Sequence, residues 1–401
     1  MDKQKLWTKE FIISACVNFF VALNFYLLMI ITSEYSISKF NSSPNTAGFA
    51  ASIFIIGALI SRVFTGRFIA RTGYKNMLFI GVIAGLVMSL AYYGINSIMR
   101  LLIIRFFHGV AFGITSTSTA TIVSDIIPEE RRGEGIGYYS LSQILATAIG
   151  PFLGIFLSQL GSYSVIFATC TIASVINLLI VPFLSLRKKE FKHVQQSGMP
   201  GGRISNFVEP KAISISIVCL LIYMCYSNIV SFLAVYAKEI NLADAARFFF
   251  IVYAVVVLIS RPMVGKLIDS KGENTIMYPA IIVFSVGVFV FSHSYYGFML
   301  LLSAVLVGLG FGAIASSTQT IAVKVTPPHR LGLANSTYYM LCDIGMGIGP
   351  LAVGFIIPYT GYRGMYTIVS AIALVCILLY YLLHGKKVTN ENSAHKQDTL
   401  N

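Results

Sequence analysis

Apolar segments of about 20 residues recur along the whole chain, separated by short polar joints. A helix that rises about 1.5 Å per residue needs roughly that length to cross the hydrocarbon layer of a bilayer. We count twelve such segments. Of the 401 residues, 56% are hydrophobic and only 11% are charged, which is far more apolar surface than a soluble domain of this size could cover. The sequence therefore predicts an all-α membrane protein with twelve transmembrane helices.

The second half of the chain repeats the first. The stretch ISRVFTGRFIARTG at residues 60–73 returns as ISRPMVGKLIDSKG at residues 259–272, an offset of 199 residues (259 − 60). The same offset relates Gly109 to Gly308 and Pro128 to Pro327, which indicates a duplication. We therefore predict two pseudo-symmetric six-helix bundles. The predicted parts are an N-terminal bundle at 1–186, a cytoplasmic linker at 187–211, a C-terminal bundle at 212–384 and a cytoplasmic tail at 385–401.

Basic residues are distributed by side of the membrane. The net charge is +13, which by itself would be compatible with a nucleic-acid partner. However, twenty Lys and Arg residues fall in the termini or in alternate joints, and only five fall in the other joints. By the positive-inside rule this places both termini in the cytoplasm. We expect a multi-pass protein of the plasma membrane with the lipid bilayer, and no nucleic acid, as its partner.

Metal and enzyme chemistry find no support in the motifs. The six cysteines lie inside apolar spans without CxxC or Cys/His spacing, and we interpret them as small buried hydrophobic residues. No Ser/His/Asp, Cys/His or HExxH arrangement stands out. The sequence therefore predicts no metal site, no cofactor and no enzyme.

The stretch GRFIARTGYK at residues 66–75 resembles the cytoplasmic loop motif of the major facilitator superfamily, GxLxDRxGRR in its ideal form. We expect a sharp turn here, which requires glycine. The resemblance implies a cytoplasmic gate in which the charges of the loop hold the two halves together. The Asp position of the motif is Ala70, and the Asp appears only in the second copy. The candidate gate residues are Gly66, Arg71, Gly73, Asp125, Gly265 and Asp269.

Arg71 is the charge of this motif that the resemblance pairs with an acid, here Asp125 at the cytoplasmic end of span four. The equivalent positions in the second half are Ser270 and Lys324. That pair therefore cannot form there, and the gate is expected to be asymmetric. The alternative is that the basic residues of the loop only follow the positive-inside rule.

Span four contains Arg105, His108, Gly109 and Gly113 in a pattern that resembles the RxxqGxg motif of the superfamily. An Arg inside the bilayer costs several kcal/mol unless it has water or a partner. The resemblance implies a role for Arg105 in proton transfer. The alternative is that the side chain extends to the outer surface. His108 occupies the usual Gln position and is a secondary candidate for titration.

Span five resembles the GxxxGPxxGG motif of the antiporter branch, and a second copy occurs near the end of the chain. Small residues permit close helix approach and Pro permits a kink. Ordinary close packing predicts the same residue types, but their position favours export over import. The residues concerned are Gly150, Pro151, Gly154, Gly349 and Pro350.

Asp343 lies about eleven residues into a span that begins near Gly332, which is close to the bilayer midplane at about 1.5 Å per residue. A carboxylate at that depth must titrate, pair or face water. We predict a proton or cation site that faces the cavity, with an ion pair to a neighbouring span as the alternative. The predicted substrate cavity is lined by Asn18, Asn24, Tyr26, Gln143, Asn228 and Gln319.

As a whole the chain resembles the twelve-span drug:proton antiporters of the major facilitator superfamily. The resemblance implies a monomeric secondary active transporter that exports a small amphipathic or cationic molecule in exchange for protons by alternating access. Two alternatives within transport are a dedicated exporter of one metabolite, such as a siderophore, and a proton-coupled importer. A transporter-like sensor without flux is a third. Ala70 in place of Asp is the departure from the pattern of a typical multidrug pump.

Overall fold

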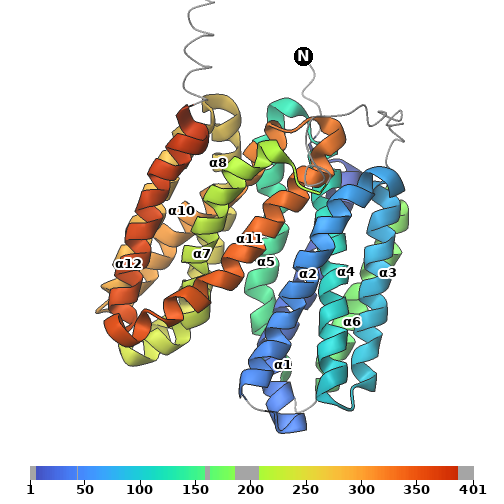
Figure 1. Cartoon of the computed structure of the whole chain (residues 1–401), viewed down its shortest axis with the longest axis horizontal. Helices are drawn as coiled ribbons and strands as arrows, with labels where there is room; N and C mark the ends of the chain where they lie inside the picture. Colours follow the sequence, from blue (N-terminus) through green and yellow to red (C-terminus); the bar gives the residue numbers. More distant parts are fainter. Residues whose placement is uncertain (1–5, 43, 159–162, 186–206, 387–401) are drawn as a thin grey trace, which may run out of the picture. The chain divides into compact units, whose positions relative to one another are not determined.

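The computed structural model describes residues 6–42, 44–158, 163–185 and 207–386; residues 187–206 of the predicted linker and 387–401 of the predicted tail lie outside these ranges. Within them the chain forms α-helices and short 3-10 or π turns, without strands. This confirms the predicted all-α fold class. The helices are α1 (Lys9–Phe40), α2 (Pro44–Thr72), α3 (Tyr74–Ala91), α4 (Ile98–Ile126), α5 (Arg132–Ser158), α6 (Tyr163–Ile180), α7 (Pro210–Glu239), α8 (Ala243–Lys271), α9 (Glu273–Ser292), α10 (Gly297–Lys324), α11 (Leu331–Gly354) and α12 (Ile357–Tyr380) (Figure 1).

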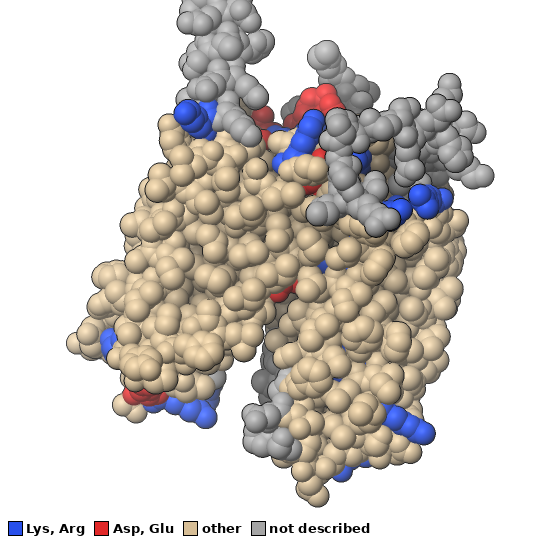
Figure 2. All heavy atoms as spheres, in the orientation of Figure 1, with Lys and Arg blue, Asp and Glu red and all other residues tan. Residues whose placement is uncertain are grey.

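Ten helices in the described ranges are long and apolar enough to cross a membrane. A helix satisfies its backbone hydrogen bonds internally, which lipid cannot do for it. Figure 2 shows Lys, Arg, Asp and Glu mainly at the helix ends, with other residues along nearly all of the surface between them. The helices α5 and α11 are not among the ten. Both contain many Gly, Ser and Thr residues together with Gln143, Asn335 and Asp343.

The repeated motif is helical, and this corrects the prediction of a loop. Helix α2 continues through residues 60–72, and α8 continues through residues 259–271. The reversal of chain direction occurs at Gly73 and Gly272, whose φ angles are 85° and 84°. Only glycine adopts this backbone conformation without steric cost. One residue in each copy therefore makes the turn, and Gly66 and Gly265 serve another purpose.

The described residues divide into two compact units. The first unit comprises Met1–Pro128, Tyr139–Glu209 and Thr326–Met340, and the second comprises Glu129–Tyr138, Pro210–Val325 and Leu341–Asn401. The start of α5 therefore belongs to the second unit, and the start of α11 belongs to the first. Each unit contains residues from both halves of the sequence.

The core of the first unit is built around α4, which packs against α1, α2 and α3. An aromatic cluster lies near the beginning of α4 in space, where Tyr92 stacks on Phe167 with ring centroids 5.2 Å apart. Tyr35 packs edge-on against the same Phe167 ring at 5.5 Å. Tyr35, Tyr92 and Phe167 are all buried, so this cluster joins α1, the short 3-10 turn Tyr92–Gly94 after α3, and α6.

In the second unit α10 occupies the equivalent central place, in contact with α7, α8 and α9. Tyr226 of α7 stacks on Phe311 of α10 at 3.8 Å between ring centroids. A second group joins Tyr236, Phe291 and Tyr366, with the Phe291 and Tyr366 rings 4.6 Å apart. The apolar side chains that remain exposed, such as Ile259 and Leu378, are those expected on helices that face lipid.

Candidate functional site

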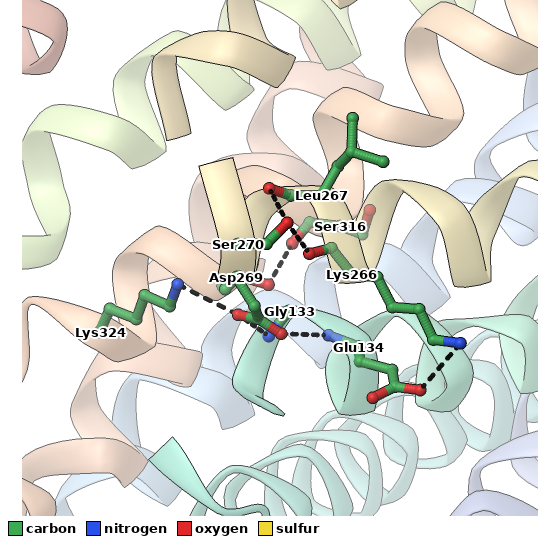
Figure 3. Close-up of polar contacts among 9 residues, drawn as sticks. Gly133, Glu134, Lys266, Leu267, Asp269, Ser270, Ser316 and Lys324 are labelled. Carbon is green, nitrogen blue, oxygen red and sulfur yellow. Dashed lines mark hydrogen bonds and ion pairs between the residues drawn. The ribbon is translucent and has the colours of Figure 1, made fainter. Parts of the chain in front are cut away.

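The carboxylate of Asp269, near the end of α8, binds the beginning of α5 (Figure 3). Its Oδ1 accepts a hydrogen bond from the Gly133 backbone N–H at 2.9 Å, and its Oδ2 accepts one from the Glu134 N–H at 2.9 Å. The first N–H groups of a helix have no partner within the helix, and the helix dipole favours an anion at this end. Asp269 therefore caps α5 from a different helix.

Two glycines make this approach possible. A Cβ on Gly265 would lie 2.6 Å from the Gly133 carbonyl oxygen, and a Cβ on Gly133 would lie 2.1 Å from a methyl carbon of Ile268. Separations under about 3 Å cannot be tolerated without movement of the backbone or the neighbouring side chain. Gly265 thus allows close helix approach and does not form a turn.

Charged side chains surround the capping carboxylate. Lys324 at the end of α10 places its Nζ 3.2 Å from Oδ1 of Asp269. Glu134 lies 3.8 Å from Lys266 (Figure 3). It also lies 2.8 Å from Arg131. The role of Lys324 was not predicted, because the sequence comparison aligned it with Asp125 and Ser270 with Arg71. The sequence did contain a signal for this ion pair, because the acid Asp269 directly precedes Ser270.

In the first unit Gly66 holds the equivalent place against the start of α11. A Cβ on Gly66 would lie 2.5 Å from the Ser336 Cβ, and one on Gly332 would lie 2.3 Å from a methyl carbon of Ile69. The Ser336 hydroxyl donates a hydrogen bond to the carbonyl oxygen of Arg62. The close approach is therefore repeated, while the position equivalent to Asp269 is Ala70 in the sequence.

The other predicted gate residues of the first half do not assemble as expected. Arg71 is exposed in the last turn of α2, and among the described ion pairs none joins it to Asp125. The predicted Arg71–Asp125 pair is therefore not formed in this structure, and Gly73 acts as the turn.

Two buried arginines were missed by the sequence reasoning. Arg62 of α2 and Arg261 of α8 are 3% and 4% exposed. The Arg62 guanidinium lies 4.7 Å from the Tyr339 ring centroid and 5.6 Å from that of Phe112. Its Nη1 donates to the Ser116 hydroxyl at 3.2 Å. The signal was present, because both residues occupy the same place in the repeated ISR sequence.

Arg105 lies inside the first unit and is 0% exposed, so it does not extend to the outer surface. Its Nε donates to the Ala50 carbonyl at 3.3 Å, and its guanidinium lies 4.8 Å from the Phe54 ring centroid. The hydroxyl of Tyr92 lies 3.2 Å from Nδ1 of His108, and both side chains interact electrostatically with Arg105. A buried cation is thus held by a carbonyl dipole and aromatic faces.

Asp343 occupies the middle of α11 and is half-buried. The preceding residue, Cys342, faces Cys219 of α7 with 3.4 Å between the sulfur atoms. Thr318 of α10 donates to the Cys219 sulfur at 3.3 Å, and Gln319 beside it is buried. The structure therefore places Asp343 on a helix whose adjacent face packs on α7.

The remaining predicted cavity residues make contacts within their own unit. Asn18 donates to the Ser142 hydroxyl at 2.8 Å and so joins α1 to α5, on which Gln143 also lies. Asn228 donates to the Met224 carbonyl of its own helix at 2.8 Å. Tyr26 is half-buried and packs edge-on against Phe25. Asn24 faces α6 and a small internal cavity, which is described below.

Most of the predicted packing glycines make close contacts. A Cβ on Gly150 would lie 2.7 Å from the Tyr26 Cβ, and one on Gly349 would lie 2.1 Å from the Ser227 hydroxyl oxygen. Gly154 is less crowded, with its nearest neighbour at 3.2 Å. Pro350 lies inside α11. The Pro151 side chain lies outside the described set.

The protein is a duplicated helical membrane protein. Its helices carry buried arginines, and polar contacts form where helices begin. These are features of a polytopic membrane transporter. The chain matches the family model described as Major Facilitator Superfamily over residues 14–295 and 215–399. It belongs to this superfamily, as its sequence resemblance predicted.

Named relatives cover most of the chain at low identity. An uncharacterised MFS-type transporter of Methanocaldococcus jannaschii is 24% identical over 336 residues, with 82% of this chain and 86% of the relative covered. Multidrug resistance protein MdtG of Dickeya zeae is 24% identical over 399 residues, with 96% and 97% covered.

Solved structures share the fold. The human organic anion transporter MFSD10 aligns with a TM-score of 0.76 at 13% identity, covering 92% of this chain and 98% of its own. The proton:xylose symporter XylE aligns with a TM-score of 0.76 at 15% identity, covering 93% and 94%.

Proposed function

We propose that this transporter exports a small amphipathic or cationic molecule in exchange for protons, by alternating access. The direction and the substrate class are supported by the similarity to proteins named multidrug resistance protein MdtG. We place it in the plasma membrane as a monomer, with both termini in the cytoplasm.

The observation that carries the proposal is the contact between Asp269 and the start of α5. It consists of hydrogen bonds and an ion pair near a helix end, where water can replace each partner. A hydrogen bond to a charged group contributes only about 1.5–3 kcal/mol net, because water competes for the same groups. Such a contact can open and close during a transport cycle, as a cytoplasmic gate requires.

In this proposal Asp343 is the carboxylate that exchanges protons, and Arg105 is a fixed charge in the proton-coupling machinery. Supporting this, Asp343 lies in the middle of α11, a helix rich in small and polar residues. An acid at that depth must titrate, pair or face water. The assignment of Arg105 is supported by its burial, because its charged side chain lies fully inside the first unit.

The test is proton release from purified protein in a weakly buffered sample. Candidate lipophilic cations are added, and the pH change is compared between wild type and Asp343→Asn. We expect release from wild type and loss of most of it in Asp343→Asn. Asp244→Asn is the matched control, because Asp244 is an exposed acid of α8, 93% accessible, that pairs with Arg247; its release should equal that of wild type.

Wild type that binds a substrate and releases no protons between about pH 5.5 and 8 would contradict proton antiport. Equal release from Asp343→Asn and wild type would contradict only the assignment of Asp343. Arg105→Ala in the same assay tests the second site independently, with circular dichroism as the check that the variant is folded.

A dedicated exporter of one metabolite is the second candidate, and Ala70 is the observation that favours it. The multidrug pattern has Asp at this position. A dedicated exporter should release protons with one polar compound and respond little to a panel of lipophilic cations. The same assay therefore separates the two candidates.

A further inference from the structure

A small cavity lies inside the first unit, between α1, α3, α4 and α6. Its volume is about 20 Å³, and roughly 10–15 Å³ is enough for one water molecule. Apolar residues such as Val82 and Phe112 form part of the wall. The polar side chains that line it are Asn24, His108, Thr115, Ser174 and Asn177.

Two of these side chains lack a hydrogen-bond partner for their oxygen. Asn24 and Asn177 are 4% and 2% exposed, and neither Oδ1 atom has a partner among the described residues. The Asn24 amide group is committed, because Nδ2 donates to the Cys170 carbonyl at 3.2 Å and to the Ser174 hydroxyl at 3.1 Å. Rotating this carboxamide would leave Nδ2 without those bonds. Its oxygen therefore needs a donor from elsewhere.

The neighbouring hydroxyls cannot supply that donor. The Ser174 hydroxyl donates to the Cys170 carbonyl at 2.9 Å, and the Thr115 hydroxyl donates to the Ala111 carbonyl at 2.8 Å. Each hydroxyl has a single hydrogen. His108 uses Nδ1 in its contact with the Tyr92 hydroxyl, which leaves Nε2 as the polar ring atom available to the cavity.

The lining also selects against a cation. Arg105 lies one turn before His108 on α4, is fully buried and interacts electrostatically with the His108 ring. None of the residues that line the cavity is an acid. A second positive charge beside Arg105, without a carboxylate, is unfavourable in a low-dielectric interior. A neutral donor of two hydrogen bonds fits the site.

In the second half of the chain, most of the equivalent positions hold apolar residues. At the offset of 199 residues, Gly85 corresponds to Phe284 and His108 to Val307. Asn24 and Asn177 correspond to Tyr223 and Cys376. Phe284 and Val307 are fully buried. The fold therefore does not require polar groups here, and those of the first unit need a separate reason.

We propose that this cavity binds one water molecule, which donates hydrogen bonds to the carboxamide oxygens of Asn24 and Asn177 and bonds to His108. The water joins α1, α4 and α6 through a single hydrogen-bonded centre. Because it completes the bonding of the imidazole that contacts Tyr92, it also selects the tautomer of His108.

The test uses Gly85→Ala, which places a methyl group in the cavity wall without a clash. The nearest heavy atom to a Cβ at this position is Ala111 Cβ, 4.0 Å away. In a dry cavity this change stabilises the protein, because Ala is favoured over Gly in helices and the cavity is filled. With the water displaced, both carboxamide oxygens lose their donor, and we expect a melting temperature lower by about 2–4 °C.

Gly347→Ala is the control for helix propensity, because nothing lies within 4 Å of its added Cβ. It should raise the melting temperature slightly. A rise of similar size for Gly85→Ala would overturn the proposal. In the double variant Asn24→Leu/Asn177→Leu, both carboxamide oxygens that accept from the water are absent. Adding Gly85→Ala to this variant should therefore raise the melting temperature. A lower melting temperature there would also contradict the proposed water.

Two direct measurements complete the test. A cryo-EM or crystal structure at about 2 Å or better should show a density peak within hydrogen-bond distance of both carboxamide oxygens, and a clear absence overturns the proposal. When the choline salt of the sample buffer is replaced by the sodium salt at the same concentration, the melting temperature should stay unchanged. A rise with Na⁺ that is lost in Asn24→Leu would assign the site to a cation instead.

Discussion

Asp269 is at once the cap of a helix and the partner of a lysine, and these two roles depend on different properties of its carboxylate. Capping needs two acceptor oxygens aimed at the N–H groups of Gly133 and Glu134. Pairing with Lys324 needs only a negative charge nearby. Because hydrogen bonds to a charged group contribute about 1.5–3 kcal/mol and a partly exposed ion pair contributes less, capping should dominate.

This ranking can be measured at the residue level. Asp269→Asn should lower stability by about 1.5–3 kcal/mol, since an amide offers one acceptor and no charge. Lys324→Gln should cost less than about 1 kcal/mol. Thermal unfolding of both variants in detergent checks the order, with Asp244→Asn as the control.

The exchanged pair Asp269→Lys/Lys324→Asp separates the two roles further. It restores opposite charges but directs a lysine at two backbone N–H groups, so stability should stay low. Recovery to the wild-type melting temperature would show that the ion pair, and not the cap, holds this contact.

Single residues were the hardest features to predict. The sequence comparison found Asp269 and Gly265 because they stand in a recognisable motif. It missed Lys324, whose contact with Asp269 depends on how α8 and α10 are rotated about their axes. Arg62 and Arg261 were overlooked although their repetition in the ISR sequence was visible.

Among the helices, α11 shows how spacing separates packing glycines from permissive ones. Gly345 and Gly349 meet α7, and a Cβ on either would lie within 2.4 Å of α7 atoms. Gly347 lies between them on the exposed side, with nothing within 4 Å. One helical turn separates the two packing positions, so both fall on the same face.

Substitution by Ala should therefore have opposite signs along this helix. Gly349→Ala forces α7 and α11 apart and should cost about 1–3 kcal/mol. Gly347→Ala should gain up to about 1 kcal/mol from helix propensity. Melting temperatures of the two purified variants check the prediction, and a loss of similar size in both would show that this packing argument is wrong.

The positions of helices were predicted better than their ends. The apolar segments located all twelve α-helices of the described ranges, but the motif at residues 66–75 was interpreted as a loop because it is polar and rich in glycine. Polarity there marks the point where the helix leaves the hydrocarbon layer. The helix itself continues until Gly73, where the backbone requires a positive φ.

At the level of the whole molecule, the fold followed from two features of the sequence. Segments long enough to cross a bilayer admit little besides helices, and the 199-residue repeat explains why each half supplies six. The substrate could not be predicted, because it depends on which polar side chains share a cavity. Asn24 bonds to Ser174 in the first unit and Asn228 bonds to Met224 in the second, and neither bond identifies a substrate.

The membrane topology of the chain can be tested directly. Both termini are expected in the cytoplasm because basic residues gather in alternate joints. Green fluorescent protein fused after residue 386 should therefore fluoresce in cells, and alkaline phosphatase at the same place should be inactive. A matched fusion in the joint before Gly297 should give the opposite pair of results. Active phosphatase at the C-terminus would reverse the assigned orientation.

Because the start of α5 belongs to the second unit and the start of α11 to the first, a cut in the linker does not separate the chain into its two units. A fragment that ends in the linker would contain residues 129–138 without the unit to which they belong, and the other fragment would likewise carry residues 326–340. Neither half-chain alone contains all the residues of one unit. Co-expressed halves should therefore protect each other from proteolysis, whereas either half made alone should be degraded, so that the covalent boundary between the halves does not coincide with the boundary of a foldable part.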